Sequence, residues 1–100
     1  MRFARNVQFT IKPGKQKDFN TVFETKILPV LQKQNGFEDS FVLINGNQGI
    51  GISLWNDRIS AESYAKTGYA QVLEALRPVI EGTPQVQVCE VPFSTLHATV

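Results

Sequence analysis

The chain has 100 residues, which is the length of one small domain. Hydrophobic residues make up 42% of it, enough for a folded core. Ten Lys and Arg residues against nine Asp and Glu residues leave a net charge of +1, which favours neither nucleic acid nor an acidic membrane surface as a partner. The single cysteine, Cys89, cannot form an internal disulfide, and no apolar stretch is long enough to span a membrane. We therefore expect a folded cytoplasmic protein.

The first element is predicted to be a half-buried strand that ends near Ile11. Apolar residues alternate with polar ones along it, and Arg5 lies among the apolar positions. The apolar positions are Phe3, Val7, Phe9 and Ile11. Lys12-Pro13-Gly14 then predicts a turn, because proline cannot extend the ladder and glycine tolerates the turn geometry.

A helix is predicted next, because apolar residues recur at steps of three and four positions. These residues are Phe19, Val22, Phe23, Ile27, Val30 and Leu31. Pro29 lies inside this run and predicts a kink, since its ring removes one backbone hydrogen bond. Asn35-Gly36 predicts the end of the helix.

The second half of the chain predicts two strands, a helix and a last strand. Residues 41–44 and 50–55 form a hairpin around a glycine- and asparagine-rich loop. The helix extends from about Ser60 to Ile80 and is weakened in the middle by Gly68. Residues 86–91 alternate as a fourth strand, and residues 92–100 form a tail.

The order strand, helix, strand, strand, helix, strand predicts an α+β, ferredoxin-like fold over residues 1–91. In this βαββαβ arrangement a four-stranded antiparallel sheet carries both helices on one face. The first and third strands are then central, and the fourth lies beside the first.

Alternation sorts the strand residues onto two faces of this sheet. The face toward the helices is predicted to carry Val7, Phe9, Ile11, Ile50, Ile52, Leu54, Val86 and Val88. The opposite face is predicted to carry Asn6, Gln8, Thr10, Gly51, Ser53, Trp55, Gln85, Gln87 and Cys89. Because this second face is polar but uncharged, we expect it to be covered by the same face of a second copy, giving a homodimer. An ordinary solvent-exposed face is the alternative.

Several kinds of site are not supported by the sequence. One histidine, His97, and one cysteine are too few for a zinc site, and neither is paired with a base or an orienting group. Gly46, Gly49 and Gly51 join two strands and so do not form a phosphate-binding loop before a helix. The third strand has no basic residue and one aromatic residue, unlike an RNA-recognition strand. We expect no metal site and no nucleic-acid partner.

Four short patterns occur in order along the chain. They are Lys12-Pro13-Gly14 before the first helix, Pro29 late in that helix, Gly36-Phe37 at the second strand, and Leu54-Trp55-Asn56-Asp57 before a helix that contains Tyr64. Together, over roughly residues 3–91, they resemble the antibiotic biosynthesis monooxygenase superfamily. The resemblance implies a homodimer in which two sheets face each other, a dimeric α/β barrel, with a pocket between sheet and helices in each subunit.

The resemblance also implies an activity, because some members oxidise small aromatic or quinol-type compounds with O2 and no cofactor. It suggests catalytic roles for Tyr64, Arg77 and Asn6, and substrate-binding roles for Trp55, Tyr69, Phe23 and Phe9. Arg5 is a further candidate at the first strand. A plainer reading exists for several of them. Trp55 fills the dimer interface, Tyr64 forms a hydrophobic staple at the start of its helix, Tyr69 packs in the core, and Arg77 is a solvated charge.

Haem-degrading members of the same fold use an Asn on the first strand and a Trp and a His on the second helix. This chain has Val7, Tyr64 and Glu74 at those places, so haem degradation is not expected. The alternative to an oxygenase is a non-catalytic small-molecule-binding or stress-response dimer, since the sequence offers no convincing acid, base or nucleophile.

Overall fold

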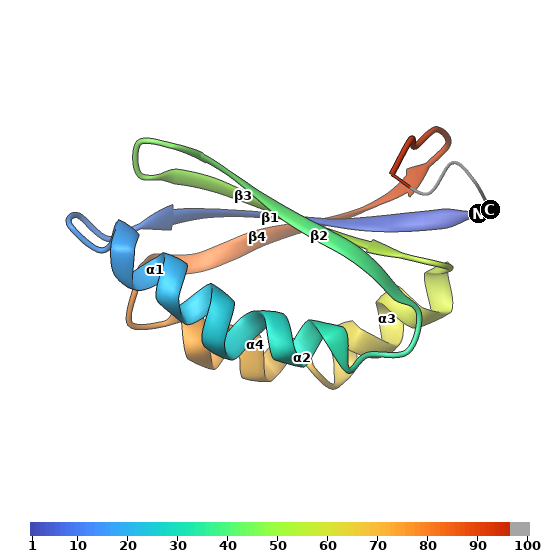
Figure 1. Cartoon of the computed structure of the whole chain (residues 1–100), viewed down its shortest axis with the longest axis horizontal. Helices are drawn as coiled ribbons and strands as arrows, with labels where there is room; N and C mark the ends of the chain where they lie inside the picture. The colour runs from blue at the N-terminus through green and yellow to red at the C-terminus, as the bar shows by residue number, and fades with distance from the viewer. Residues whose placement is uncertain (97–100) are drawn as a thin grey trace.

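The computed structural model describes residues 1–96, so residues 97–100 of the predicted tail, including His97, lie outside the described residues. Figure 1 shows a twisted sheet with the helices on one of its faces. The elements in chain order are β1 (Arg2–Ile11), α1 (Gln16–Val22), η1 (Phe23–Ile27), α2 (Leu28–Gln32), β2 (Phe37–Asn45), β3 (Gln48–Trp55), α3 (Arg58–Lys66), α4 (Tyr69–Leu76) and β4 (Ile80–Val91). The sheet order is β2-β3-β1-β4 and every pair is antiparallel. The predicted α+β ferredoxin-like fold is confirmed.

The first helix contains a π-helical turn, η1, directly before Pro29. The N–H of Leu28 donates to the carbonyl of Phe23, five residues back, instead of four. Pro29 has no N–H and lies in the first turn of α2, where that donor is not needed. The irregularity predicted at Pro29 is therefore a widened turn on its N-terminal side, and α1, η1 and α2 form one continuous helical rod (Figure 1).

The second helix is divided into α3 and α4 at Thr67-Gly68. Gly68 is buried, and a Cβ there would lie 2.9 Å from Nε2 of Gln34 and 3.0 Å from Cδ1 of Tyr64. The glycine therefore allows the break in the helix to lie close to α2. The predicted C-terminal end of this helix, near Ile80, was too late, since α4 ends at Leu76 and β4 already begins at Ile80.

The predicted faces are correct for β1 and wrong for β3. Phe3 pairs with Trp55, Arg5 with Ser53 and Val7 with Gly51, so these β3 residues face the helices. Ile50, Ile52 and Leu54 point to the opposite face, which we call the open side of the sheet.

The strand β3 has this orientation because its glycines leave space for the ring of Phe9. A Cβ on Gly49 would overlap the Phe9 ring, whereas a Cβ on Gly51 would lie 3.8 Å from it. The glycines of β3 thus face the helices because the aromatic ring of β1 occupies the space above them. The apolar run of β3 misled the sequence prediction, because the open side is not uniformly polar.

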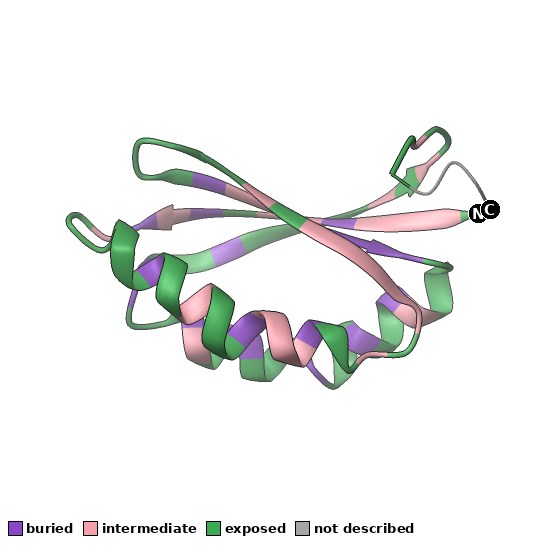
Figure 2. Ribbon diagram, viewed as in Figure 1, coloured by how far each residue is buried: buried purple, intermediate pink, exposed green. Residues whose placement is uncertain are grey.

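The core lies between the helix-facing side of the sheet and the helical layer (Figure 2). Trp55 is 0% exposed and belongs to this core, so the prediction that it lies on the inter-sheet face is wrong. Val86 and Val88 are exposed at the β4 edge, although their strand partners Val7 and Arg5 face the helices. Within residues 1–96, none of the helices is long and apolar enough to cross a bilayer.

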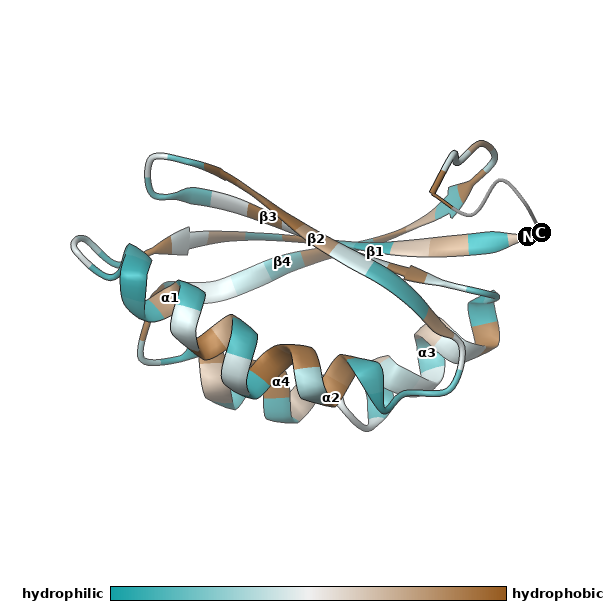
Figure 3. Ribbon diagram, in the orientation of Figure 1, coloured by the Kyte–Doolittle hydropathy of each residue, from teal (hydrophilic) through white to brown (hydrophobic). Residues whose placement is uncertain are grey.

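The open side of the sheet has an apolar half and a polar half. Hydrophobic residues gather on β2 and β3, as Figure 3 shows, and amide side chains occupy β1 and β4. The apolar half carries Phe41, Leu43, Ile50, Ile52 and Leu54, and the polar half carries Asn6, Gln8, Gln85 and Gln87. Phe41 and Leu43 are 41% and 55% exposed. This face therefore presents large apolar side chains to its surroundings.

Candidate functional site

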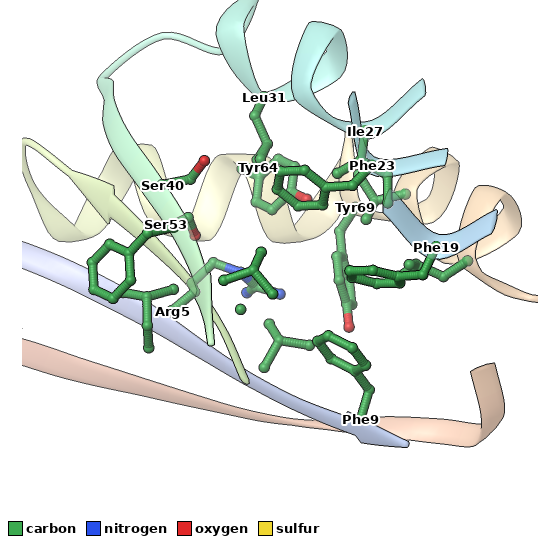
Figure 4. Close-up of a pocket in the computed structure, with 17 residues that line it drawn as sticks. Arg5, Phe9, Phe19, Phe23, Ile27, Leu31, Ser40, Ser53, Tyr64 and Tyr69 are labelled. Carbon is green, nitrogen blue, oxygen red and sulfur yellow. The ribbon is translucent and has the colours of Figure 1, made fainter. Parts of the chain in front are cut away.

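A cavity of about 60 Å³ lies between the helix-facing side of the sheet and the helical layer. Most of its aromatic lining comes from Phe9 of β1, Phe19 of α1, Phe23 of η1, Tyr64 of α3 and Tyr69 of α4. Phe41 of β2 and aliphatic residues complete most of the wall. Figure 4 shows these side chains converging from the sheet and from the helices.

The aromatic wall is built by stacking. The rings of Phe9 and Phe19 stack with their centroids 5.0 Å apart, and Phe23 follows at 6.1 Å from Phe19. The π-helical turn contributes both Phe23 and Ile27 to the wall. Such turns occur often at functional sites. One side of the cavity is therefore an apolar surface suited to a planar ring.

Arg5 is the charged residue in this lining. It is 3% exposed, and its guanidinium group points into the cavity (Figure 4). Its guanidinium carbon lies 5.2 Å from the ring centroid of Tyr64 and 4.6 Å from that of Tyr69. Within residues 1–96 it makes no ion pair, and its Nε atom is buried without a hydrogen-bond partner. Burial lowers the pKa of Arg5, and the two tyrosines oppose that effect.

The two tyrosines hold neutral hydroxyls at the cavity. Burial raises the pKa of Tyr64 well above its usual range, and the charge of Arg5 opposes this only in part. The pKa of Tyr69 is raised by the same cause. The hydroxyl of Tyr69 is buried without a partner, and in Figure 4 it points into the space between Arg5 and Phe9. Both phenols can therefore donate hydrogen bonds at neutral pH.

Trp55 supports the site from behind. Its ring stacks on Tyr64 with centroids 4.9 Å apart, and Phe37 meets it edge-on at 5.6 Å. Its indole Nε1–H donates to Oγ of Ser53 at 2.9 Å. Trp55 itself does not line the cavity, but Ser53 and Tyr64 do. Because Trp55 contacts both of them, it fixes their positions.

The structure brings five of the eight residues proposed from the sequence to the cavity and leaves three outside its lining. Arg5, Tyr64, Tyr69, Phe23 and Phe9 line the cavity, and Trp55 lies behind Tyr64. The side chain of Arg77 is 73% exposed and pairs with Glu74 at 3.3 Å, away from the cavity. Asn6 lies on the open side of the sheet, beside Gln87 of β4.

The central residue of the cavity, Arg5, was a secondary candidate in the sequence. Its signal is its position, because a charged residue occurs on the apolar side of an alternating strand. Ser53 was missed, since the predicted face of β3 directed it away from the helices. No sequence pattern indicated that Ser40 of β2 lines the same cavity.

The lining contains no carboxylate, histidine or thiol, and no metal-ligand cluster of three or more such residues occurs among residues 1–96. The polar groups are one guanidinium, two phenols and the hydroxyls of Ser40 and Ser53. The arrangement can therefore orient a ligand, donate hydrogen bonds and stabilise negative charge.

Comparison with protein-family models finds no match, and no curated protein matches the sequence. Solved structures match over nearly the whole chain. The protein of unknown function NE2512 from Nitrosomonas europaea superimposes with a TM-score of 0.77 at 19% identity, covering 94% of this chain and 92% of that one.

Two further structures come from oxygenases by name. SnoaB from Streptomyces nogalater, a cofactor-independent oxygenase, has a TM-score of 0.74 at 20% identity over 94% of this chain and 96% of its own. A protein from Nitrosomonas europaea that carries the provisional name antibiotic biosynthesis monooxygenase has a TM-score of 0.75 at 10% identity, over 94% and 93%. The chain therefore has the fold of the antibiotic biosynthesis monooxygenases.

Proposed function

We propose that the protein is a cofactor-independent monooxygenase that acts in the cytoplasm on a small aromatic or quinol-type compound. The observation that carries this proposal is the cavity, whose aromatic wall faces a cluster of hydrogen-bond donors. The fold supports it, because SnoaB, a cofactor-independent oxygenase, has the same fold. Fold alone does not determine activity, so the chemistry of the cavity has to fit.

The cavity fits a reaction in which the substrate supplies the electrons. Oxidation of a ring CH2 group to a carbonyl by O2 releases one water molecule and needs no external reductant. The protein then has to bind the ring, keep bulk water out and stabilise charge on the substrate oxygens. In the proposal, Phe9 and Phe23 contact the ring and the phenols of Tyr64 and Tyr69 donate to its oxygens.

A substrate ring requires the cavity to expand. A dry cavity of about 150 Å³ is needed to hold benzene, and this one measures about 60 Å³. Phe23 is partly buried and lies on the π-helical turn, so its rotation is the simplest way to enlarge the site. We propose that ligand binding displaces Phe23 toward solvent.

The oxygenase proposal is tested by oxygen consumption. A panel of quinols and anthrone-type compounds is added to the purified protein, and uptake is followed with an oxygen electrode while products are identified by mass. We expect turnover with at least one compound. Replacing Tyr69 or Tyr64 by Phe removes one donor and should lower kcat/KM by about tenfold to a hundredfold.

Gln71→Ala provides a matched control, because Gln71 is exposed on the same helix as Tyr69 and should leave turnover unchanged. Unchanged turnover in both tyrosine variants would remove these residues from the proposed mechanism. The absence of any acid or base from the lining favours one competing function, a non-catalytic binding protein. Ligand binding by calorimetry without oxygen uptake across the whole panel would establish that function.

A further inference from the structure

Arg5 is a buried cation without a counter-charge. It is 3% exposed, none of the residues that line its cavity is acidic, and the ion pairs among residues 1–96 do not include it. Taking an arginine out of water without a partner costs several kcal/mol in proteins. A residue kept in such a place has either a structural or a binding role.

The tyrosine rings compensate for the charge only in part. Tyr64 and Tyr69 contact the guanidinium through their π faces, at 5.2 and 4.6 Å. Those contacts leave the N–H groups in the plane of the guanidinium unused, and Nε is buried without an acceptor. Stacking thus fixes the plane of the fork and leaves its donors directed into the cavity.

A second donor without a partner faces the same space. The hydroxyl of Tyr69 is buried and unpaired, and Figure 4 places it at the cavity near the Arg5 guanidinium. This phenol is protonated at neutral pH, since its usual pKa of 10.0 lies well above that value and burial raises the pKa of Tyr69 further. The charge of Arg5, its Nε–H and the Tyr69 hydroxyl therefore favour a ligand that has both acceptor oxygens and negative charge. Water offers acceptor oxygens but no negative charge.

We propose that this cavity binds its ligand through an anionic oxygen group, a carboxylate or a phenolate, held by Arg5 and Tyr69. The body of the ligand packs against Phe9, Phe19 and Phe23. The inference rests on the proposed function for the cavity being a ligand site, and it adds the charge state that the site selects. In the proposal, the cavity of about 60 Å³ holds the oxygen-bearing end, and the ring enters as Phe23 moves.

Neutral and cationic ligands fit the site less well. A cation would be repelled by Arg5 in a low-dielectric setting. A neutral amide satisfies the donors but leaves the charge uncompensated, and hydrogen bonds to a charged partner are stronger than those to a neutral one. The site should therefore discriminate between two ligands of the same shape that differ in charge.

Benzoate and benzamide are such a pair, and the experiment measures their affinities by isothermal titration calorimetry. Benzoate is expected to bind roughly tenfold to a hundredfold more tightly than benzamide. Arg5→Met preserves the length of the side chain and should abolish this preference, and Tyr69→Phe should reduce it. Equal affinities for the two ligands in the wild type, or an unchanged preference in Arg5→Met, would exclude a carboxylate, and would overturn the proposal if a phenolate series shows no dependence on Arg5 either.

Arg58→Met is the matched control. Arg58 also stacks on an aromatic ring, with its guanidinium carbon 5.1 Å from the centroid of Phe3, but its side chain is 64% exposed and pairs with Glu62. This variant should keep the full preference for benzoate. Arg5→Lys keeps the charge and loses the planar fork, so it should retain part of the preference even if Arg5→Met folds poorly.

A second ligand, 4-nitrophenol, distinguishes recognition of a phenolate from recognition of a carboxylate, because its hydroxyl ionises near neutral pH. If a phenolate is the preferred group, 4-nitrophenol binds more tightly above its own pKa than below it, and Arg5→Met removes the difference. If a carboxylate is preferred, benzoate alone shows the dependence on Arg5. Either pattern supports anion selection, whereas no dependence on Arg5 in either series contradicts it.

Failure of the inference and failure of the oxygenase proposal are distinguishable. Anion-selective binding without oxygen uptake by any substrate would support the anion-binding site and contradict the oxygenase proposal. Turnover of substrates that remain neutral, with no effect of Arg5→Met on their KM, would support the oxygenase proposal and contradict anion selection.

Discussion

Arg5 places a charge in the core at the expense of stability. Its desolvation costs several kcal/mol, while contacts with two tyrosine rings return about 2 kcal/mol when desolvated. Nothing among the described residues offers it an opposite charge. Because the desolvation cost exceeds the gain from the ring contacts, the free protein would be more stable without the guanidinium group. Such a loss of stability is typical of a residue kept for binding.

The first prediction follows from this balance. Arg5→Met should raise the free energy of unfolding by about 1–2 kcal/mol, because Met fills similar space and needs no hydrogen bond. Urea denaturation of the two proteins without ligand measures the difference. A loss of about 2 kcal/mol or more would instead make Arg5 a structural residue whose stacking on Tyr64 and Tyr69 stabilises the core.

The second prediction concerns the buried phenols. The pKa of Tyr64 is raised above its usual value of 10.0 in the folded protein, so the folded state holds this proton longer than the unfolded chain does. The stability that results is fully present below pH 10 and is lost as pH rises above it, because the unfolded chain then ionises first. Tyr69 adds to the same trend.

Denaturation curves at neutral pH and above pH 10 should therefore show a steep decline of stability for the wild type. Tyr64→Phe should decline less steeply, since it lacks the more deeply buried phenol. An equal decline in both proteins would mean that Tyr64 does not control the alkaline limit of stability.

At the scale of the elements, the sequence predicted the strands and helices well and one strand face wrongly. The alternation of β1 was unambiguous, because Phe9 and Ile11 are large and apolar. In β3 the residues that face the helices include Gly49 and Gly51, which carry no hydrophobic signal of their own. Their orientation depends on the ring of Phe9, a contact between strands that no pattern within β3 contains.

The third prediction uses these two glycines as a matched pair. Gly49→Ala should lower the free energy of unfolding by about 1–3 kcal/mol, because its Cβ overlaps the Phe9 ring. Gly51→Ala places its Cβ at an ordinary contact distance of 3.8 Å and should change stability little or raise it. Urea denaturation of both variants tests the pair.

Gly49→Ala has a second expected effect. The Phe9 ring stacks on Phe19 and lines the cavity, so a shift of the ring into the cavity should weaken ligand binding as well. Equal stabilities of the two alanine variants would show that the ring moves without cost.

At the scale of the whole molecule, the open side of the sheet is a surface whose apolar residues the cavity does not explain. The sequence predicted a polar, uncharged face, whereas in the structure apolar residues of β2 and β3 form half of it. Contiguous exposed apolar residues beside amides favour an interface more strongly than a polar face does. We therefore retain the homodimer as a proposal, with the open side as its interface.

The change of face also changes the variants that test the dimer. Ser53 now lines the cavity, so a lysine there would disrupt the core and say nothing about the interface. Gln8 of β1 and Leu43 of β2 both lie on the open side, outside the cavity lining, and represent its polar and apolar halves. A lysine at either position would bury an unpaired charge if two open sides meet.

The last prediction is that the wild type sediments as a dimer and that Gln8→Lys and Leu43→Lys shift it to monomer. Burying the lysine charge costs several kcal/mol, enough to weaken association by more than about a hundredfold. Gln71→Lys is the control, because it makes the same substitution on the exposed side of α4 and should leave the dimer intact. Since Gln8 is exposed in the single chain, its replacement should not unfold the monomer, which circular dichroism can verify. A wild type that sediments as a monomer, or dimers that survive both lysines, would leave the apolar half of the open side for a different partner.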